Sequence, residues 1–345
     1  MSTVEQVLER YSDVVENGVT MPGGLRYRSY AVSNLRGGVG KSTMSFNLSY
    51  EISRKNTLLV ADLCPQGNLT ETLMRGASPD VTVAKALLPK LLGPAFGDLL
   101  QDVSYRVSNH CEDFKGGKAC YVLPGDAEMF AFPSTLYQQL QVGLSRADPQ
   151  AVKRLLFSLR EILDAEAADK GCNHLLMDTS PFYAGGTHLA WCASDAIIIP
   201  VRVDEHSIDS LSLTLDMMSN AKKDFGVWNV RGGNISSPKV AAIVMTMAGS
   251  KGRLASTPGR ASQMYIERAL KIAEKYPSLF DHGQLSDAFV ITDDFVSSGQ
   301  ISGAKSIPIS KLKIGQFHSV DGKRLQVNES VTRYQREIAY LASVI

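Results

Sequence analysis

Cysteine and long apolar runs are scarce in this sequence. Its 345 residues include 5 Cys, at positions 64, 111, 120, 172 and 192, and this odd, scattered set has no C-x-x-C spacing. Such usage suits a reducing compartment. The longest apolar runs, such as Ala196 to Pro200, are too short to cross a bilayer, and no charged-then-apolar signal is seen at the N-terminus. We therefore expect a cytoplasmic protein with no transmembrane segment.

An excess of charge of one sign is also absent, because 36 Lys and Arg balance 35 Asp and Glu. What the chain does have is a 44% hydrophobic fraction, which is enough for one large core. Apolar, strand-like runs alternate with segments of helical periodicity, and this alternation predicts a parallel sheet. The predicted fold class is α/β, with a mostly parallel twisted sheet flanked by helices.

A glycine-rich loop follows the strand-like run from Tyr30 to Val32, and residues 35–43 read Leu-Arg-Gly-Gly-Val-Gly-Lys-Ser-Thr. The glycines let the backbone pass close to phosphates, while N–H groups at the start of the next helix point at the anion. A lysine at 41 supplies a point charge, and the hydroxyl of Ser42, or of Thr43 as second choice, is placed for Mg²⁺. The predicted nucleotide-binding residues are Gly37, Gly38, Val39, Gly40, Lys41, Ser42 and Thr43.

Two further apolar runs each end in an acid. Residues 57–62 end at Asp62 and continue Leu-Cys-Pro-Gln-Gly-Asn, and residues 174–178 end at Asp178 and continue Thr-Ser-Pro. Acids at the carboxyl ends of parallel strands hold Mg²⁺ in folds of this kind. A strand-end Asp is also often a helix cap. With Ser42, these two acids are the predicted metal-binding residues.

These three motifs resemble those of the ParA/MinD family of deviant-Walker P-loop ATPases, and most closely its ParA branch. The resemblance covers most of residues 29–250. It implies that ATP is sandwiched between two subunits of a homodimer and that the dimer binds DNA without sequence preference. It also implies that an adaptor protein of the ParB type stimulates hydrolysis, which releases the DNA, and that the protein moves a cargo such as a plasmid or chromosome. The protein would then be nucleoid-associated.

The sequence departs from the family pattern at two positions that bear on catalysis. Arg36 replaces the signature lysine that contacts the partner subunit's phosphates, and an arginine keeps the charge while offering a bidentate fork. Cys64 replaces an acid thought to orient the attacking water, and a largely neutral thiol is a poor acceptor. We therefore expect weak basal ATPase activity. The predicted catalytic residues are Arg36, Lys41, Asp62, Cys64 and Asp178.

Recognition of the base is less clearly encoded. Relatives often place an asparagine at the end of a late strand to contact adenine, and this chain has Thr246 there. Pro308 is a second candidate for contact with the base, although a turn proline explains it better.

Basic residues are concentrated late in the chain. Residues 221–345 hold 17 Lys and Arg against 10 Asp and Glu. This half is the candidate DNA face, although single basic residues on a solvated surface are common. The predicted DNA-binding residues are Lys251, Arg253, Arg260, Arg268 and Lys271.

The predicted domain organisation has two parts. Residues 1–28 form an N-terminal helical extension, because apolar residues recur at helical spacing from Val4 to Val15, and the sequence does not decide whether it packs on its own chain or on a partner. Residues 29–345 form the P-loop ATPase domain. Within that domain, residues 276–325 are rich in Gly, Ser and Pro, and predict an insertion made of strands or loops.

Two alternative functions stay open. One is a MinD-like membrane-surface switch, for which the C-terminal helix has an apolar stripe at Val331, Ile338, Leu341, Ala342 and Ile345. Core packing explains that stripe better, because the helix lacks the dense Lys/Arg face of an interfacial anchor. The other is a scaffold that binds nucleotide and hydrolyses it slowly, which Arg36 and Cys64 both favour.

Overall fold

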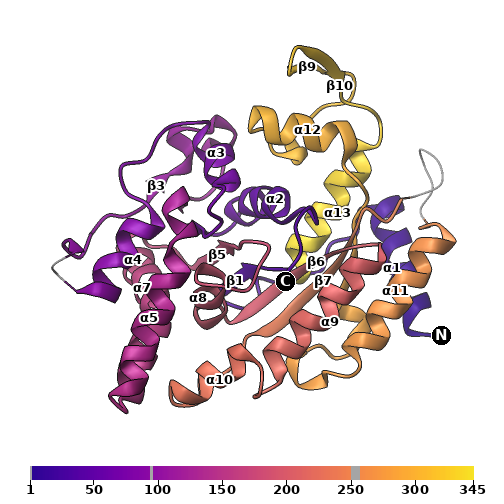
Figure 1. Cartoon of the computed structure of the whole chain (residues 1–345). Helices are drawn as coiled ribbons and strands as arrows, with labels where there is room; N and C mark the ends of the chain where they lie inside the picture. The colour runs from indigo at the N-terminus through magenta and orange to yellow at the C-terminus, as the bar shows by residue number, and fades with distance from the viewer. Residues whose placement is uncertain (1, 94–95, 250–256) are drawn as a thin grey trace.

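A central eight-stranded sheet organises the computed structural model, which describes residues 2–93, 96–249 and 257–345 (Figure 1). The strand order is β3-β4-β2-β5-β1-β6-β7-β8. All neighbours pair in parallel except β3 and β4. The predicted α/β class with a mostly parallel sheet is thus confirmed. The strands are β1 (Ser29–Val32), β2 (Leu58–Asp62), β3 (Tyr105–Arg106), β4 (Cys120–Leu123), β5 (His174–Asp178), β6 (Ala196–Arg202), β7 (Lys239–Thr246) and β8 (Phe289–Ile291).

Helices cover both faces of this sheet (Figure 1), which is why the central strands are buried and read as continuous apolar runs. Helices α2 and α13 pack on one face, and α4 to α11 pack on the other. They are α1 (Thr3–Asn17), α2 (Lys41–Ser53), α3 (Asn68–Met74), α4 (Val83–Leu92), α5 (Phe132–Ser145), α6 (Pro149–Leu156), α7 (Ser158–Lys170), α8 (Gly186–Ala193), α9 (Glu205–Ser219), α10 (Asp224–Arg231), α11 (Arg260–Ala273), α12 (Val296–Lys305) and α13 (Val331–Val344).

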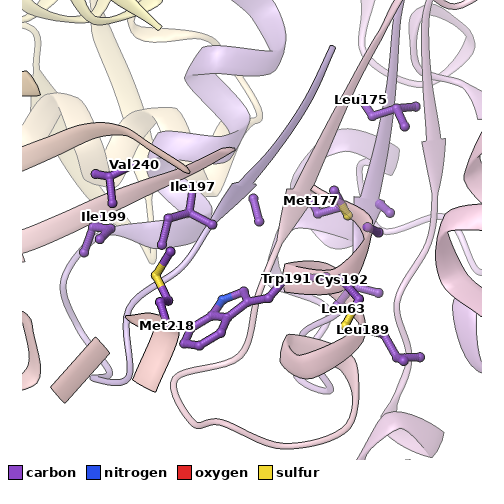
Figure 2. Close-up of a cluster of buried hydrophobic side chains, with 14 of the residues drawn as sticks. Leu63, Leu175, Met177, Leu189, Trp191, Cys192, Ile197, Ile199, Met218 and Val240 are labelled. Carbon is purple, nitrogen blue, oxygen red and sulfur yellow. The ribbon is translucent and has the colours of Figure 1, made fainter. Parts of the chain in front are cut away.

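Figure 2 shows part of the larger core, where alternate strand residues meet helix α8. The Trp191 side chain is fully buried there beside Ile197 and Met218. Its indole N–H donates to Ser33 Oγ at 2.8 Å. This bond ties the core to the loop between β1 and α2, because Ser33 is the first residue of that loop.

The N-terminal helix α1 packs on its own chain. Its apolar residues Val7, Tyr11 and Val14 are buried, and the helix contacts α11 and α13. The Tyr11 hydroxyl donates to Glu337 Oε1 at 2.8 Å, and Arg10 pairs with Asp287. In the single chain, α1 therefore packs on this chain's own elements, and the division into an N-terminal extension of residues 1–28 and an ATPase domain stays a prediction.

Residues 276–325, predicted as an insertion of strands or loops, are more varied than that. Strand β8 is an integral edge of the central sheet, and α12 is helical. Strands β9 (Phe317–Val320) and β10 (Lys323–Gln326) form a separate antiparallel hairpin. A small hydrophobic cluster that includes Ile301 and Leu312 joins this part to α13.

The apolar stripe of α13 is buried in the core of the protein. Val331, Ile338, Leu341 and Ile345 are each at most 4% exposed, and α13 packs against α1 and α2. In the described part of the chain, no helix is both long enough and apolar enough to span a membrane.

Candidate nucleotide-binding site

The glycine-rich loop joins the end of β1 to the start of α2. Gly38 and Gly40 have φ angles of 72° and 89°, in the left-handed region that glycine adopts without strain. No described atom lies within 4 Å of where a Cβ would stand on either residue, so the loop leaves open space on that side. Since α2 begins at Lys41, its first N–H groups face the same end of the sheet. This is the arrangement of an anion cradle.

Polar side chains at the start of the loop hold it in place. Asn34 is fully buried, and its amide N–H donates to Pro200 O at 2.6 Å while Ser210 Oγ donates to its Oδ1, also at 2.6 Å. Sequence reasoning missed this anchor, because Pro200 and Ser210 belong to elements far along the chain. The loop is therefore positioned before any ligand binds, which lowers the cost of binding.

Lys41 lies beneath the loop and is only 8% exposed. Its ammonium donates to Asn34 O at 3.1 Å and to Arg36 O at 2.7 Å. Burial lowers the pKa of Lys41 to about 8, while the nearby Asp178 opposes this shift. An ammonium in such a setting gains strongly from an anionic partner.

Asp178 accepts hydrogen bonds from two hydroxyl groups of α2. Ser42 Oγ donates to its Oδ2 and Ser45 Oγ to its Oδ1, each at 2.7 Å. Burial and the neighbouring Asp62 carboxylate raise the pKa of Asp178, so a cation beside it would stabilise the ionised form. A carboxylate and a hydroxyl are hard oxygen ligands of the kind that Mg²⁺ prefers. The predicted pair Ser42 and Asp178 therefore lies together and fits a magnesium ion.

Asp62 is in register with Asp178 on the next strand, and is equally buried. Its Oδ1 accepts the N–H of Cys64 at 3.0 Å, and its Oδ2 accepts both the N–H and the hydroxyl of Thr70 at 2.8 Å. Close packing of Gly125 completes the enclosure, since a Cβ there would lie 2.5 Å from the Asp62 carbonyl oxygen. Both carboxylate oxygens thus fix the turn that follows β2.

The Cys64 side chain is buried in this turn, with 4% of the residue exposed. Burial raises the pKa of its thiol, and its charge environment includes Asp62, Asp178 and Lys41. The structure thus brings four of the five predicted catalytic residues together. At neutral pH this thiol is protonated and a weak hydrogen-bond acceptor.

Arg36 lies on the outer side of the loop and pairs within its own chain. Its Nη1 is 2.5 Å from Oδ1 of Asp204, which also caps the start of α9 by accepting the N–H of Ser207. Both side chains of the ion pair are about 30% exposed. This partner was not predicted, because no local pattern links residues so far apart.

A cavity of about 410 Å³ opens beside the loop. Thr246, the predicted base-contacting residue, lines it, and its hydroxyl donates to Val39 O at 3.4 Å. Sequence reasoning missed the opposite wall, because the segment before α12 has no nucleotide motif. Pro308 is buried and is not among the lining residues. The described lining is Val39, Gly40, Thr43, Met44, Thr246, Met247, Thr292–Val296, Gly299 and Gln300.

A second cavity, of about 380 Å³, lies on the other side of Ser42 and Thr43. Helix α3 contributes Asn68, Glu71 and Thr72, and the end of α12 contributes Ser302, Gly303 and Ala304. Glu71 is the one acid among its described lining residues. Sequence reasoning passed over this carboxylate, because it lies beyond the acidic motif.

Three of the predicted DNA-binding residues lie in the described part of the chain, all on α11. Lys251 and Arg253 lie outside the described residues. Arg260 is exposed at the start of α11. Arg268 makes two 2.5 Å bonds to the Glu205 carboxylate, and Lys271 pairs with Glu267 at 2.6 Å. Two of the three described candidates are thus neutralised by acids of the same chain.

All five cysteines are buried and unbridged. Among the described residues, no cluster of three or more His, Cys, Asp or Glu side chains has the arrangement of a metal site.

Comparisons relate this loop region to proteins that carry out partitioning. A family model described as an AAA domain matches residues 27–227. An uncharacterized protein of Pseudomonas putida is 29% identical over 195 residues, which cover 56% of this chain and 62% of that protein. The chromosome partitioning protein ParA of Caulobacter vibrioides is 25% identical, over 64% of this chain and 69% of its own length. A solved Cyanothece McdA variant in complex with ATP has a TM-score of 0.59 at 18% identity, covering 84% of this chain and 91% of that one, and shows the shared fold.

Proposed function

Because this chain belongs to the AAA-domain family of P-loop ATPases, and within it to the ParA/MinD type, we propose that it is a nucleotide-switched positioning protein. It binds Mg-ATP, forms a homodimer in that state, and binds DNA without sequence preference. An adaptor of the ParB type then links it to a plasmid, chromosome or other cargo. It works in the cytoplasm on the nucleoid. The ParA of C. vibrioides, a chromosome partitioning protein, supports this proposal by its similarity.

The observation that carries the proposal is the joint placement of Lys41, Ser42 and Asp178 beneath the glycine loop. The loop N–H groups and the Lys41 ammonium bind the β- and γ-phosphate oxygens, which replace the carbonyls of Asn34 and Arg36. The Ser42 hydroxyl and Asp178 would hold Mg²⁺, which would neutralise charge on the phosphates. Thr246 and the segment before α12 enclose the base.

Slow hydrolysis follows from the side chains around the phosphates. Both oxygens of Asp62 already accept protein hydrogen bonds, and Cys64 presents a buried thiol. A positioned base contributes about 10²- to 10⁴-fold to proton transfer, and neither of these groups is arranged to supply it. The ATP-bound dimer is therefore long-lived. If hydrolysis is slow enough, the protein acts as the slowly hydrolysing scaffold.

Dimerisation would use Arg36. In the single chain its guanidinium is paired with Asp204, so it must exchange this carboxylate for a phosphate of the partner's nucleotide. A guanidinium suits such an exchange, because carboxylate and phosphate oxygens accept the same bidentate fork. The membrane-surface alternative is less supported, since the apolar residues of α13 are packed inside the chain.

The test combines light scattering with fluorescence anisotropy of two unrelated duplexes. With Mg-ATP we expect a doubled mass and binding to both duplexes with similar affinity, and neither without nucleotide. The affinity should fall steeply with salt, because neutralised phosphates release counterions. A protein that stays monomeric with Mg-ATP, or that binds one duplex only, would contradict the proposal.

A further inference from the structure

A basic segment joins α12 to α13 and includes the hairpin of β9 and β10, which lies beyond α12 at the top of Figure 1. Its cations are Lys305, Lys311, Lys313, Lys323 and Arg324, and all five are exposed. Asp321, in the hairpin turn, is the one acid between residues 305 and 324. We name residues 305–326 the basic arm.

The cations of the basic arm differ from those of α11 in their partners. Among the described residues, none of the five forms an ion pair with an acid. On α11, by contrast, Arg268 and Lys271 are bound to carboxylates of this chain. An unpaired surface cation keeps its full field for an external anion, whereas a paired one must first lose its partner.

Arg324 is held in a defined orientation. Its guanidinium carbon lies 4.0 Å from the centre of the Phe317 ring, which is on the neighbouring strand. Phe317 is itself 49% exposed, so the stack lies on the surface. A guanidinium stacked on a ring keeps its N–H groups free at the edge, and loses less freedom when it binds phosphate.

We propose that the basic arm is a binding surface for the phosphate backbone of duplex DNA, with Lys323 and Arg324 at its tip as the main contacts. A two-stranded antiparallel ribbon is narrow enough to follow a DNA groove. The cations on it contact phosphates and carry no sequence code, which fits sequence-indifferent binding. This inference rests on the proposed function, and gives its DNA contact a place that differs from α11.

Helix α12 gives the basic arm a physical connection to the nucleotide. Gly299 and Gln300, early in α12, line the cavity beside the loop, and Ser302 to Ala304 line the cavity beside Ser42. The same helix packs against β9 and β10, and Ile301 belongs to the cluster that supports them. A nucleotide in either cavity would therefore touch the helix that supports the basic arm.

The experiment compares two double variants by anisotropy on one duplex with Mg-ATP, and follows dimer mass by light scattering in the same samples. K323A/R324A should bind DNA at least tenfold more weakly and still dimerise. Its plot of log affinity against log salt should lose about two units of slope, since each phosphate contact contributes about 0.9. The matched control R268A/K271A, which removes paired cations, should stay within about threefold of the original protein.

The conservative exchange K323R/R324K keeps both charges and should restore most of the affinity, which separates a charge effect from damage to the hairpin. Unchanged DNA binding by K323A/R324A would contradict the proposal that the basic arm binds DNA, and would leave the proposed function intact. A larger loss in R268A/K271A would place the DNA on α11 instead. A last measurement uses vesicles of anionic phospholipid. If the original protein dimerises and binds these vesicles through Lys323 and Arg324, but does not bind DNA, that result would contradict both the DNA-binding role of the basic arm and the DNA binding in the proposed function.

Discussion

The ends of strands β2 and β5 look alike in sequence and lie side by side in the sheet, yet their acids have different partners. Asp178 accepts hydroxyls from Ser42 and Ser45 on the helix that follows the glycine loop. Asp62 accepts N–H and hydroxyl groups from the turn and helix after its own strand. Both are fully buried, so neither position nor burial distinguishes them.

The difference lies in what each carboxylate would lose to a metal. The hydroxyls on Asp178 can rotate and donate elsewhere, so its oxygens can turn to a cation at small cost. The N–H groups of Cys64 and Thr70 are fixed by the backbone, and would be left unsatisfied if Asp62 turned away. Asp178 is thus suited to binding a metal ion, and Asp62 is suited to stabilising the fold.

The largest effect should come from Lys41→Ala on the β5 side of this comparison. Lys41 is a buried cation whose hydrogen bonds in the described structure go to two neutral carbonyls, so its ammonium should gain most from the nucleotide phosphates. Its loss should weaken ATP binding by at least about 100-fold, or about 3 kcal/mol, and abolish the ATP-dependent dimer. The folded state should be kept, because the side chain donates only to two loop carbonyls. Isothermal titration measures the affinity and light scattering the dimer. Lys55→Ala, just after the same helix, is the control, and an ATP-induced dimer of Lys41→Ala would reject the role of this lysine.

The comparison itself is tested by exchanging each acid for its amide. Asp62→Asn should lower the free energy of unfolding by about 1–3 kcal/mol, because an amide nitrogen must then face a donor of the turn. Asp178→Asn should cost less stability, but should remove most of the Mg²⁺ dependence of nucleotide affinity, an effect of about tenfold. Urea unfolding and nucleotide titrations with and without Mg²⁺ measure both quantities. If Asp62→Asn loses the Mg²⁺ dependence and Asp178→Asn the stability, the two assignments must be exchanged.

Local motifs explain what the sequence could predict. The loop from Gly37 to Thr43 and the two strand-end acids are contiguous patterns, and each lies where parallel β-α units place them. The α/β class followed from the same alternation. What could not be predicted depends on pairs distant in sequence: Asn34 with Ser210, Arg36 with Asp204, and Arg268 with Glu205. Charge content on a helix likewise says nothing about which cations already have an acid beside them.

The smallest expected effect concerns Cys64, whose surroundings include both acids. It follows Asp62 in the turn, but its side chain lies in the electrostatic environment of Asp178 and Lys41. Cys64→Asp should raise single-turnover ATP hydrolysis by on the order of tenfold, because it restores the carboxylate that the family resemblance implies at this position for orienting the attacking water. A positioned base can contribute more, but the new charge is buried beside two acids, so its geometry and ionisation are imperfect. Phosphate release from preformed ATP-bound dimers, with and without DNA, measures the rate.

Cys64→Ser is the matched control, because it has similar size and no charge, and should leave the rate near that of the original protein. A brisk original rate that Cys64→Asp does not change would mean that another carboxylate already holds the water. Asp62 is then a poor candidate for that carboxylate, since both its oxygens accept hydrogen bonds from the protein. Asp178 is also a poor candidate, because it accepts a hydrogen bond from Ser42 at the start of α2. Glu71 would be the next to test, because it shares a cavity with Ser42. A loss of rate in Glu71→Gln would move the catalytic acceptor from the turn after β2 to helix α3, and the prediction of weak basal ATPase activity would be abandoned.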